Sequence, residues 1–146
     1  MRRPPRIVII TVGVLVFLAL SFELARWLTL ENVERTDILD LLSAQARGDA
    51  ASMLAQLHAC TESCREHVRT DARTLKRPGT VLILADSSAT KYTLTGATGF
   101  TRIAWKVTGR LPVVQCVTVE RTGNALTGLD VRLLRVSLPI PSTSDC

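Results

Sequence analysis

The sequence predicts an α+β protein with an N-terminal transmembrane helix, followed by further helices and then by a curved antiparallel sheet. Three observations predict this class. Residues 7–22 form a run of sixteen residues without a charge. Apolar residues then recur at helical spacing as far as residue 77, and from residue 80 their period changes to two. With 146 residues, the chain has room for one small domain behind the first helix.

The first expected element is a transmembrane signal-anchor helix at residues 7–30. As a helix the uncharged run is roughly 24 Å long, short of a hydrocarbon core of about 30 Å, and its continuation to Leu30 supplies the difference. The alternative is a removable signal peptide, because Ala19-Leu20-Ser21 has the small-residue spacing of a cleavage site. The chain stays apolar and compatible with a helix beyond Ser21, which favours a retained anchor.

The charges around this helix predict its orientation. Arg2, Arg3 and Arg6 lie in a basic tail of residues 1–6, and such residues are retained on the cytoplasmic side. We therefore expect a single-pass protein of the cell membrane whose residues 31–146 form an extracytoplasmic domain. The three arginines also supply three units of the net charge of +5, so nucleic acid is not an expected partner of that domain.

The domain is expected to begin with helices between about residues 33 and 77. The first covers residues 33–47. Its core-facing residues follow i, i+3, i+4, i+7 spacing and are Ile38, Leu41, Leu42, Gln45 and Ala46. Three of its charged residues are expected to face water: Glu34, Arg35 and Asp40. Gly48 suits the end of this helix.

Two shorter helices are expected next. Asp49 suits the N-cap of a second helix, whose core-facing residues are expected to be Ala51, Leu54 and Leu57. The stretch from Ser63 to Glu66 has the composition of a capping box for a third helix, which should end before Pro78. Its apolar face is expected to carry Cys64, Val68, Ala72 and Leu75.

Strands are expected between about residues 80 and 137, because apolar and polar residues alternate there. The candidate strands are residues 80–86, 91–95, 101–107, 113–121 and 126–137. Turn-forming residues separate them at 87–88, 96–99, 108–109 and 122–124. The alternation is clearest at Ile103, Trp105 and Val107, which should face the core. Short connections of this kind predict an antiparallel meander.

Four cysteines lie in the part of the chain expected to be exported, where an even count favours disulfides. Of the three possible pairings, we prefer Cys60 with Cys64 and Cys116 with Cys146. Cysteines at i and i+4 of one regular helix are too far apart to bond, so Cys60 should lie in the turn before the third helix. The alternative is a zinc site formed by His58, Cys60, Cys64 and His67, although this spacing matches no common zinc module. No other cofactor is expected.

The order of these elements, together with the stretch Ala44-Gln45-Ala46-Arg47-Gly48-Asp49-Ala50-Ala51, resembles the nuclear transport factor 2-like group of cystatin-like folds. The resemblance covers roughly residues 33–138. Many small exported bacterial proteins share this layout behind a membrane anchor. The resemblance implies a cone-shaped domain whose mouth binds small molecules, or a sheet that is used for dimerisation. Pocket Asp residues and a Tyr carry the chemistry of the ketosteroid-isomerase-like enzymes of this fold. This chain has one tyrosine, Tyr92, and only Glu120 and Asp130 lie within its last two predicted strands, so the resemblance carries over the fold and no catalytic residue.

Two sets of residues are candidate functional sites. A pocket at the cone mouth would involve Tyr92, Trp105, Gln115 and Asp130, although residues of this kind more often belong to a core. A basic face of the third helix would involve Arg65, Arg69, Arg73, Lys76 and Arg77, with anionic lipid headgroups as a possible counterpart. The alternative is a solvated face, since Glu62, Glu66 and Asp71 lie between these residues.

No catalytic motif is present in the sequence. The first functional hypothesis is therefore a non-enzymatic single-span membrane protein. Its extracytoplasmic domain would bind another envelope protein or form a homodimer. The second hypothesis is a small pocket enzyme or small-ligand carrier that uses the mouth of the cone.

Overall fold

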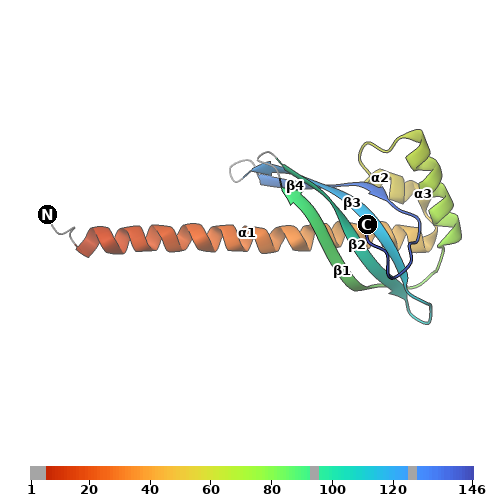
Figure 1. Cartoon of the computed structure of the whole chain (residues 1–146), viewed down its shortest axis with the longest axis horizontal. Coiled ribbons are helices and arrows are strands. Elements are labelled where there is room, and N and C mark those ends of the chain that lie inside the picture. Colours follow the sequence, from red (N-terminus) through yellow and green to blue (C-terminus); the bar gives the residue numbers. More distant parts are fainter. Residues whose placement is uncertain (1–5, 93–95, 125–127) are drawn as a thin grey trace. The chain divides into compact units, whose positions relative to one another are not determined.

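The computed structural model describes residues 6–92, 96–124 and 128–146, without the side chains of residues 6, 7, 23, 26–31, 90–92, 96, 123, 124, 128 and 129. The chain divides into two compact units, Met1–Val33 and Glu34–Cys146. Helices come first in the chain, and an antiparallel sheet follows them (Figure 1). The α+β class predicted from the sequence is therefore confirmed.

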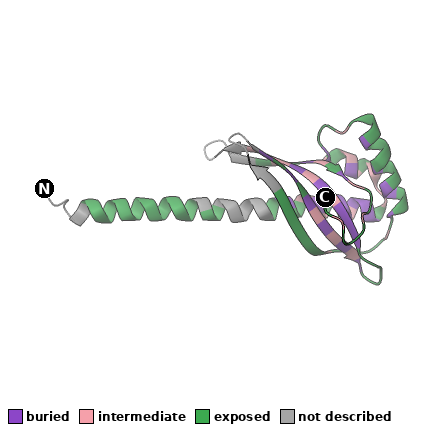
Figure 2. Ribbon diagram, in the orientation of Figure 1, coloured by how far each residue is buried: buried purple, intermediate pink, exposed green. Residues whose placement is uncertain are grey.

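Helix α1 spans Arg6–Arg47 without interruption (Figure 1). The uncharged run near its beginning is exposed, because its large apolar side chains from Val8 to Phe22 are 48–68% accessible (Figure 2). No helix within the described part of the chain is both long and apolar enough to cross a membrane, so the span predicted for residues 7–30 is not found among these residues.

The end of α1 belongs to the second unit and packs against the sheet. Its predicted core stripe is confirmed, since all five of the residues expected to face the core are buried there: Ile38, Leu41, Leu42, Gln45 and Ala46. Arg35 and Asp40 are exposed, as expected. Glu34, however, is only 5% exposed, so the prediction that it faces water is wrong. Glu34 precedes Ile38 by four residues, which places it on the same helical face.

Gly48 and Asp49 separate α1 from α2 (Ala50–Gln56), as predicted. Gly48 has φ of +78°, in the left-handed region that favours glycine at a helix end. The Asp49 carboxylate accepts a hydrogen bond from the backbone N–H of Ser52 at 3.0 Å, which is N-cap geometry.

Helix α3 spans Glu62–Thr74 and ends before Pro78, as expected. The capping box predicted from Ser63 to Glu66 is wrong, because the N-cap is Thr61 and α3 has already begun at Ser63. Cys60 therefore precedes the helix, as the disulfide geometry requires. The predicted buried face of α3 is confirmed at Cys64, Val68, Ala72 and Leu75.

The described strands form one four-stranded sheet in the order β1-β2-β3-β4 (Figure 1). Their bounds are Val81–Tyr92, Gly96–Val107, Val113–Asn124 and Gly128–Val136. Each strand pairs antiparallel with the next, so the predicted meander is confirmed.

The predicted turns at residues 87–88, 96–99 and 122–124 are wrong. Residues 122–124 are the last residues of β3 and pair with β4. Ser87 and Ser88 lie inside β1 and pair with Arg102 and Thr101 of β2, and Gly96 begins β2. Pairing with a neighbouring strand satisfies the backbone of these small and polar residues, and their composition alone does not reveal that neighbour. The other end of the predicted strand at 91–95 falls on residues 93–95, outside the described residues.

The core lies between one face of the sheet, the end of α1 and the inner sides of α2 and α3 (Figure 2). Ile103, Trp105 and Val107 of β2 contribute to it, as the alternation predicts. After β4 the chain continues along β3, where the backbone N–H groups of Ser137 and Ile140 donate to the carbonyl oxygens of Cys116 and Val114, both at 2.8 Å. The last residues then reach the opposite face of the sheet. Arg102 donates hydrogen bonds to the carbonyl oxygens of Ser142 and Ser144, the latter at 3.0 Å.

Candidate functional site: a groove between α2 and α3

A groove of about 610 Å³ lies between α2 and α3. Its apolar wall comes from α2 and the turn that follows it, through Ala51, Leu54, Ala55, Leu57, Ala59 and Cys60. Helix α3 contributes Arg65 and Arg69, which are four residues apart and lie on one side of the helix. The groove therefore combines an apolar surface with two cationic groups.

The apolar wall exists because α2 buries only part of the side that the sequence predicts. Met53 is fully buried and Leu57 nearly so, whereas Leu54 is half-buried and Ala51 is exposed. The prediction that Ala51 faces the core is therefore wrong, whereas Leu54 packs against the edge of the core. A helix of seven residues has fewer than two full turns, so its apolar spacing does not fix one inward face.

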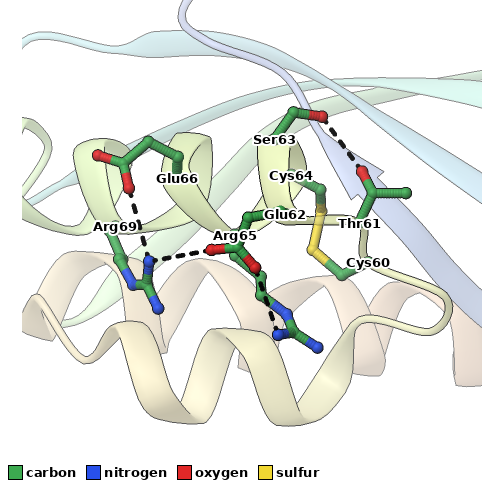
Figure 3. Close-up of polar contacts among 8 residues, drawn as sticks. All are labelled: Cys60, Thr61, Glu62, Ser63, Cys64, Arg65, Glu66 and Arg69. Atoms are coloured by element: carbon green, nitrogen blue, oxygen red, sulfur yellow. Dashed lines mark hydrogen bonds and ion pairs between the residues drawn. A yellow bond between two sulfur atoms is a disulfide. The ribbon is translucent and has the colours of Figure 1, made fainter.

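The turn after α2 is held at three points. The backbone N–H of His58 donates to the carbonyl oxygen of Leu133 in β4 at 2.8 Å, and Leu57 forms a parallel bridge with the same residue. Ala59 has φ of +55°, a region that residues other than glycine seldom adopt. Cys60 forms a disulfide with Cys64 of α3 (Figure 3), which confirms the preferred pairing. This part of the wall is therefore fixed to both β4 and α3.

Within the described part of the chain, the ion pairs of the two arginines are long. Glu62 lies between their guanidinium groups (Figure 3), with Arg65 Nη1 3.5 Å from its Oε2 and Arg69 Nη1 3.6 Å from its Oε1. Arg69 is also 3.5 Å from Glu66. A strong charge-assisted hydrogen bond is shorter, at about 2.7–2.9 Å. Since all four side chains are 44–76% exposed, each pair contributes no more than about 1 kcal/mol.

The other members of the predicted basic face do not line the groove. Arg77 donates from Nη1 to the carbonyl oxygen of Leu111 at 2.8 Å. The methylene groups of Lys76 lie so close to Gly48 that a Cβ there would be 2.9 Å from its Cδ. Arg73 is exposed on α3. The structure therefore divides the predicted basic face into a pair at the groove, Arg65 and Arg69, and three cations elsewhere.

The described members of the candidate pocket at the cone mouth divide between the core and the surface. Trp105 and Gln115 are fully buried, and Trp105 Nε1 donates to Gln115 Oε1 at 2.8 Å. Gln45 Nε2 donates to the same oxygen at 3.3 Å, and Gln115 Nε2 donates to the carbonyl oxygen of Ser137 at 2.8 Å. Asp130 is exposed and accepts from Arg132. The side chain of Tyr92 lies outside the described residues. Trp105 and Gln115 thus belong to a hydrogen-bond network in the core, whereas Asp130 forms an exposed ion pair with Arg132.

The zinc alternative does not fit the structure. Cys60 and Cys64 are joined in a disulfide, so neither is available as a thiolate ligand. His58 and His67 are both exposed. Among the described residues, no group of three or more His, Cys, Asp or Glu side chains is placed to hold a metal ion.

Glu34 is a buried anion that the sequence interpretation missed. Its Oε1 accepts from Thr101 Oγ1 at 2.7 Å, and its Oε2 accepts from Nε of Arg121 at 2.7 Å and also from Nη2. The i, i+4 relation of Glu34 to Ile38 was the signal that could have found it. This cluster joins α1 to β2 and β3 within the second unit.

Asp71 is a second missed residue. It is fully buried on α3, and neither carboxyl oxygen has a hydrogen-bond partner in the described part of the chain. Burial raises the pKa of Asp71 from 3.8 to about 6. Asp71 follows Cys64 by seven residues and precedes Leu75 by four, so the helical spacing already places it on the apolar face.

Comparisons with known proteins give no relative for this chain: no family model, curated protein or solved structure matches it.

Proposed function

We propose that this chain is a single-pass membrane protein, with its amino terminus in the cytoplasm and its α+β domain outside, where the domain binds another protein. The observation that carries the proposal is the exposed apolar surface of α1. Its large side chains from Val8 to Phe22 are 48–68% exposed and surround the helix on all sides. A helix that is apolar all round is stable in a lipid or protein environment, not in water. Arg2, Arg3 and Arg6 before it favour an amino terminus in the cytoplasm.

The cysteine pairs support an extracytoplasmic domain. All four cysteines are bonded, Cys60 with Cys64 and Cys116 with Cys146. Disulfides persist in oxidising compartments and are rare in the cytosol. The order of helices and meander also supports a cystatin-like fold of the nuclear transport factor 2-like kind as part of this proposal.

A binding role is supported by what the domain offers on its surface. The groove between α2 and α3 presents apolar side chains next to two arginines. Trp105 and Gln115, two candidate residues of the pocket-enzyme hypothesis, are fully buried in the core. A partner protein, including a second copy of this chain, is therefore a better fit than a substrate at the cone mouth.

The test is the accessibility of the domain to protease in cells that produce the full chain. A non-permeant protease added after the cell wall is opened should degrade residues 31–146 and spare a cytoplasmic control protein. Membranes washed with alkaline carbonate should retain the undigested chain. Protection of the domain in opened cells, or its release by carbonate, would refute the proposed topology.

A further inference from the structure

We propose that the groove between α2 and α3 binds an amphipathic helix of a partner protein, whose carboxylates pair with Arg65 and Arg69. This inference rests on the proposed function, in which the domain binds a protein, and it names the surface and the chemistry of the partner. It is carried by the shape of the groove, the spacing of its cations and the weakness of their present ion pairs.

The apolar wall suits a helix. Ala51 and Ala55 are four residues apart on α2 and both are exposed, so they form a row of small side chains. Small side chains allow the backbone of a second helix to approach closely. The half-buried Leu54 and the buried Leu57 give larger apolar contacts beside this row. An apolar stripe at i, i+3, i+4 and i+7 of a partner helix would cover this wall.

The cations have the same periodicity. Arg65 and Arg69 are separated by four residues, just over one helical turn, or about 6 Å of axial rise. Carboxylates at i and i+4 of a partner helix that runs alongside α3 would have the same separation. Each guanidinium group can bind a carboxylate through two parallel hydrogen bonds. Such hydrogen bonds are shorter and stronger than the 3.5–3.6 Å ion pairs with Glu62 and Glu66.

A protein helix fits this surface better than a lipid membrane does. Binding to anionic lipid is typical of clusters of four to eight cations. On α3 the carboxylates Glu62 and Glu66 lie next to the two arginines, and Arg77 is bonded to Leu111. Positive and negative side chains therefore alternate on this surface of α3, which weakens its attraction to a planar anionic membrane. Two arginines about one turn apart can instead select two carboxylates at the same spacing.

The test uses the full chain in phosphatidylcholine nanodiscs and a phage-displayed library of amphipathic helices of roughly five turns, or about 18 residues. The apolar stripe of the library is fixed and the positions that flank it are randomised. Selection on the unmodified protein should enrich Asp and Glu at flanking positions four residues apart. Selection on the R65E/R69E variant should enrich Lys and Arg at these positions instead.

The matched control is R73E, which changes an exposed arginine of the same helix outside the groove, and it should enrich the same acidic sequences as the unmodified protein. An enriched acidic peptide should lose about tenfold in affinity for R65Q/R69Q, which keeps polar side chains without charge. If charge reversal unfolds the domain, R65Q/R69Q still shows whether the two arginines bind the acidic peptide.

Three outcomes would overturn the inference: no enrichment on the unmodified protein, the same sequences enriched on R65E/R69E, or unchanged affinity for R65Q/R69Q. Flotation of the nanodiscs with phosphatidylglycerol vesicles, if lost in R65E/R69E, would also overturn it in favour of a lipid surface. The protease experiment reports the topology independently. An exposed domain without helix binding therefore refutes this inference alone, and a protected domain refutes the proposed function.

Discussion

At the scale of single residues, the described part of the domain contains two buried carboxylates with different surroundings. Glu34 accepts hydrogen bonds from Thr101 and Arg121, so its charge is compensated. Asp71 has no hydrogen-bond partner in the described part of the chain. Burial of a charge is unfavourable unless it is paired, so these two residues should affect stability in opposite ways.

Replacing Glu34 should destabilise the domain. The substitution Glu34→Ala removes the acceptor of Thr101 and leaves the partly buried Arg121, 18% exposed, without this partner. We expect a loss of about 2–3 kcal/mol in the free energy of unfolding, measured by urea denaturation in detergent. Arg35→Ala, at the exposed neighbour, is the control and should change stability by less than about 0.5 kcal/mol. Equal stabilities of the two variants would contradict the buried ion pair.

Asp71 should make stability depend on pH in an unusual direction. Its pKa is about 6 in the folded chain and 3.8 as the reference for the unfolded chain. Between these values the folded chain binds the proton and the unfolded chain does not, so the contribution of Asp71 to stability falls as pH rises from about 4 to 6. Relative to Asp71→Asn, the unmodified protein should lose about 2–3 kcal/mol across this window.

The measurement for Asp71 is a series of denaturation curves from pH 4 to pH 8. Other titrating groups act equally in both proteins, so the difference between the two isolates Asp71. Asp86→Asn, at an exposed position of β1, is the control and should follow the unmodified protein. A constant difference between the unmodified protein and Asp71→Asn at all pH values would show that Asp71 does not titrate in this window.

At the scale of elements, covalent links fix segments whose local structure is short or irregular. The disulfide between Cys60 and Cys64 closes a turn with a sequence separation of 4, and it fixes the wall of the groove. The disulfide between Cys116 and Cys146 has a separation of 30 and holds the C-terminal residues against the outer face of the sheet. The loop closed by the second is much longer, so its effect on the unfolded chain is larger.

Removing the two disulfides should therefore have unequal effects. The loop-entropy estimate gives a loss of about 3–4 kcal/mol for C116A/C146A and about 2 kcal/mol for C60A/C64A. Urea denaturation of the oxidised proteins measures both losses. In the presence of a reductant the three proteins should approach the same stability. A larger loss for C60A/C64A would mean that native contacts in the turn, not loop closure, dominate.

At the scale of the whole molecule, the two units are expected to be stable in different surroundings. The apolar part of α1 has no polar face, and the second unit has its own core. The proposed topology assigns them to lipid and to an oxidising aqueous compartment. The disulfides then provide a reporter of where the domain lies, because they form only on the exported side.

Reversing the charges before α1 should change the orientation of the chain. In the variant R2E/R3E/R6E the signal that retains the amino terminus is lost, so a larger fraction of domains should stay in the cytoplasm. These molecules would carry four free thiols. Alkylation with a maleimide polymer, followed by gel electrophoresis without reductant, counts them. R2K/R3K/R6K keeps the charge and should show the fully bonded pattern. Equal thiol counts in the two variants would contradict the proposed role of the arginines.

Much of this organisation can be predicted from the sequence, because it depends on local patterns. Helical spacing identifies the buried stripe at Ile38 and Leu41, and the Gly48-Asp49 pair marks the break between α1 and α2. Alternation identifies the core face of β2 at Trp105. The even number of cysteines favours disulfides, and the geometric limit on pairs within a helix places Cys60 in the turn before α3.

Only the tertiary structure decides which polar and small residues have partners. Ser87 and Gly96 lie in strands because neighbouring strands satisfy their backbone groups. Gln115 is not part of a cavity because Trp105 and Ser137 bond it within the core. Ala51 faces the groove because Met53 takes the buried position on a helix of less than two turns. Periodicity along the chain determines which residues share a face, and contacts between distant residues determine what covers that face.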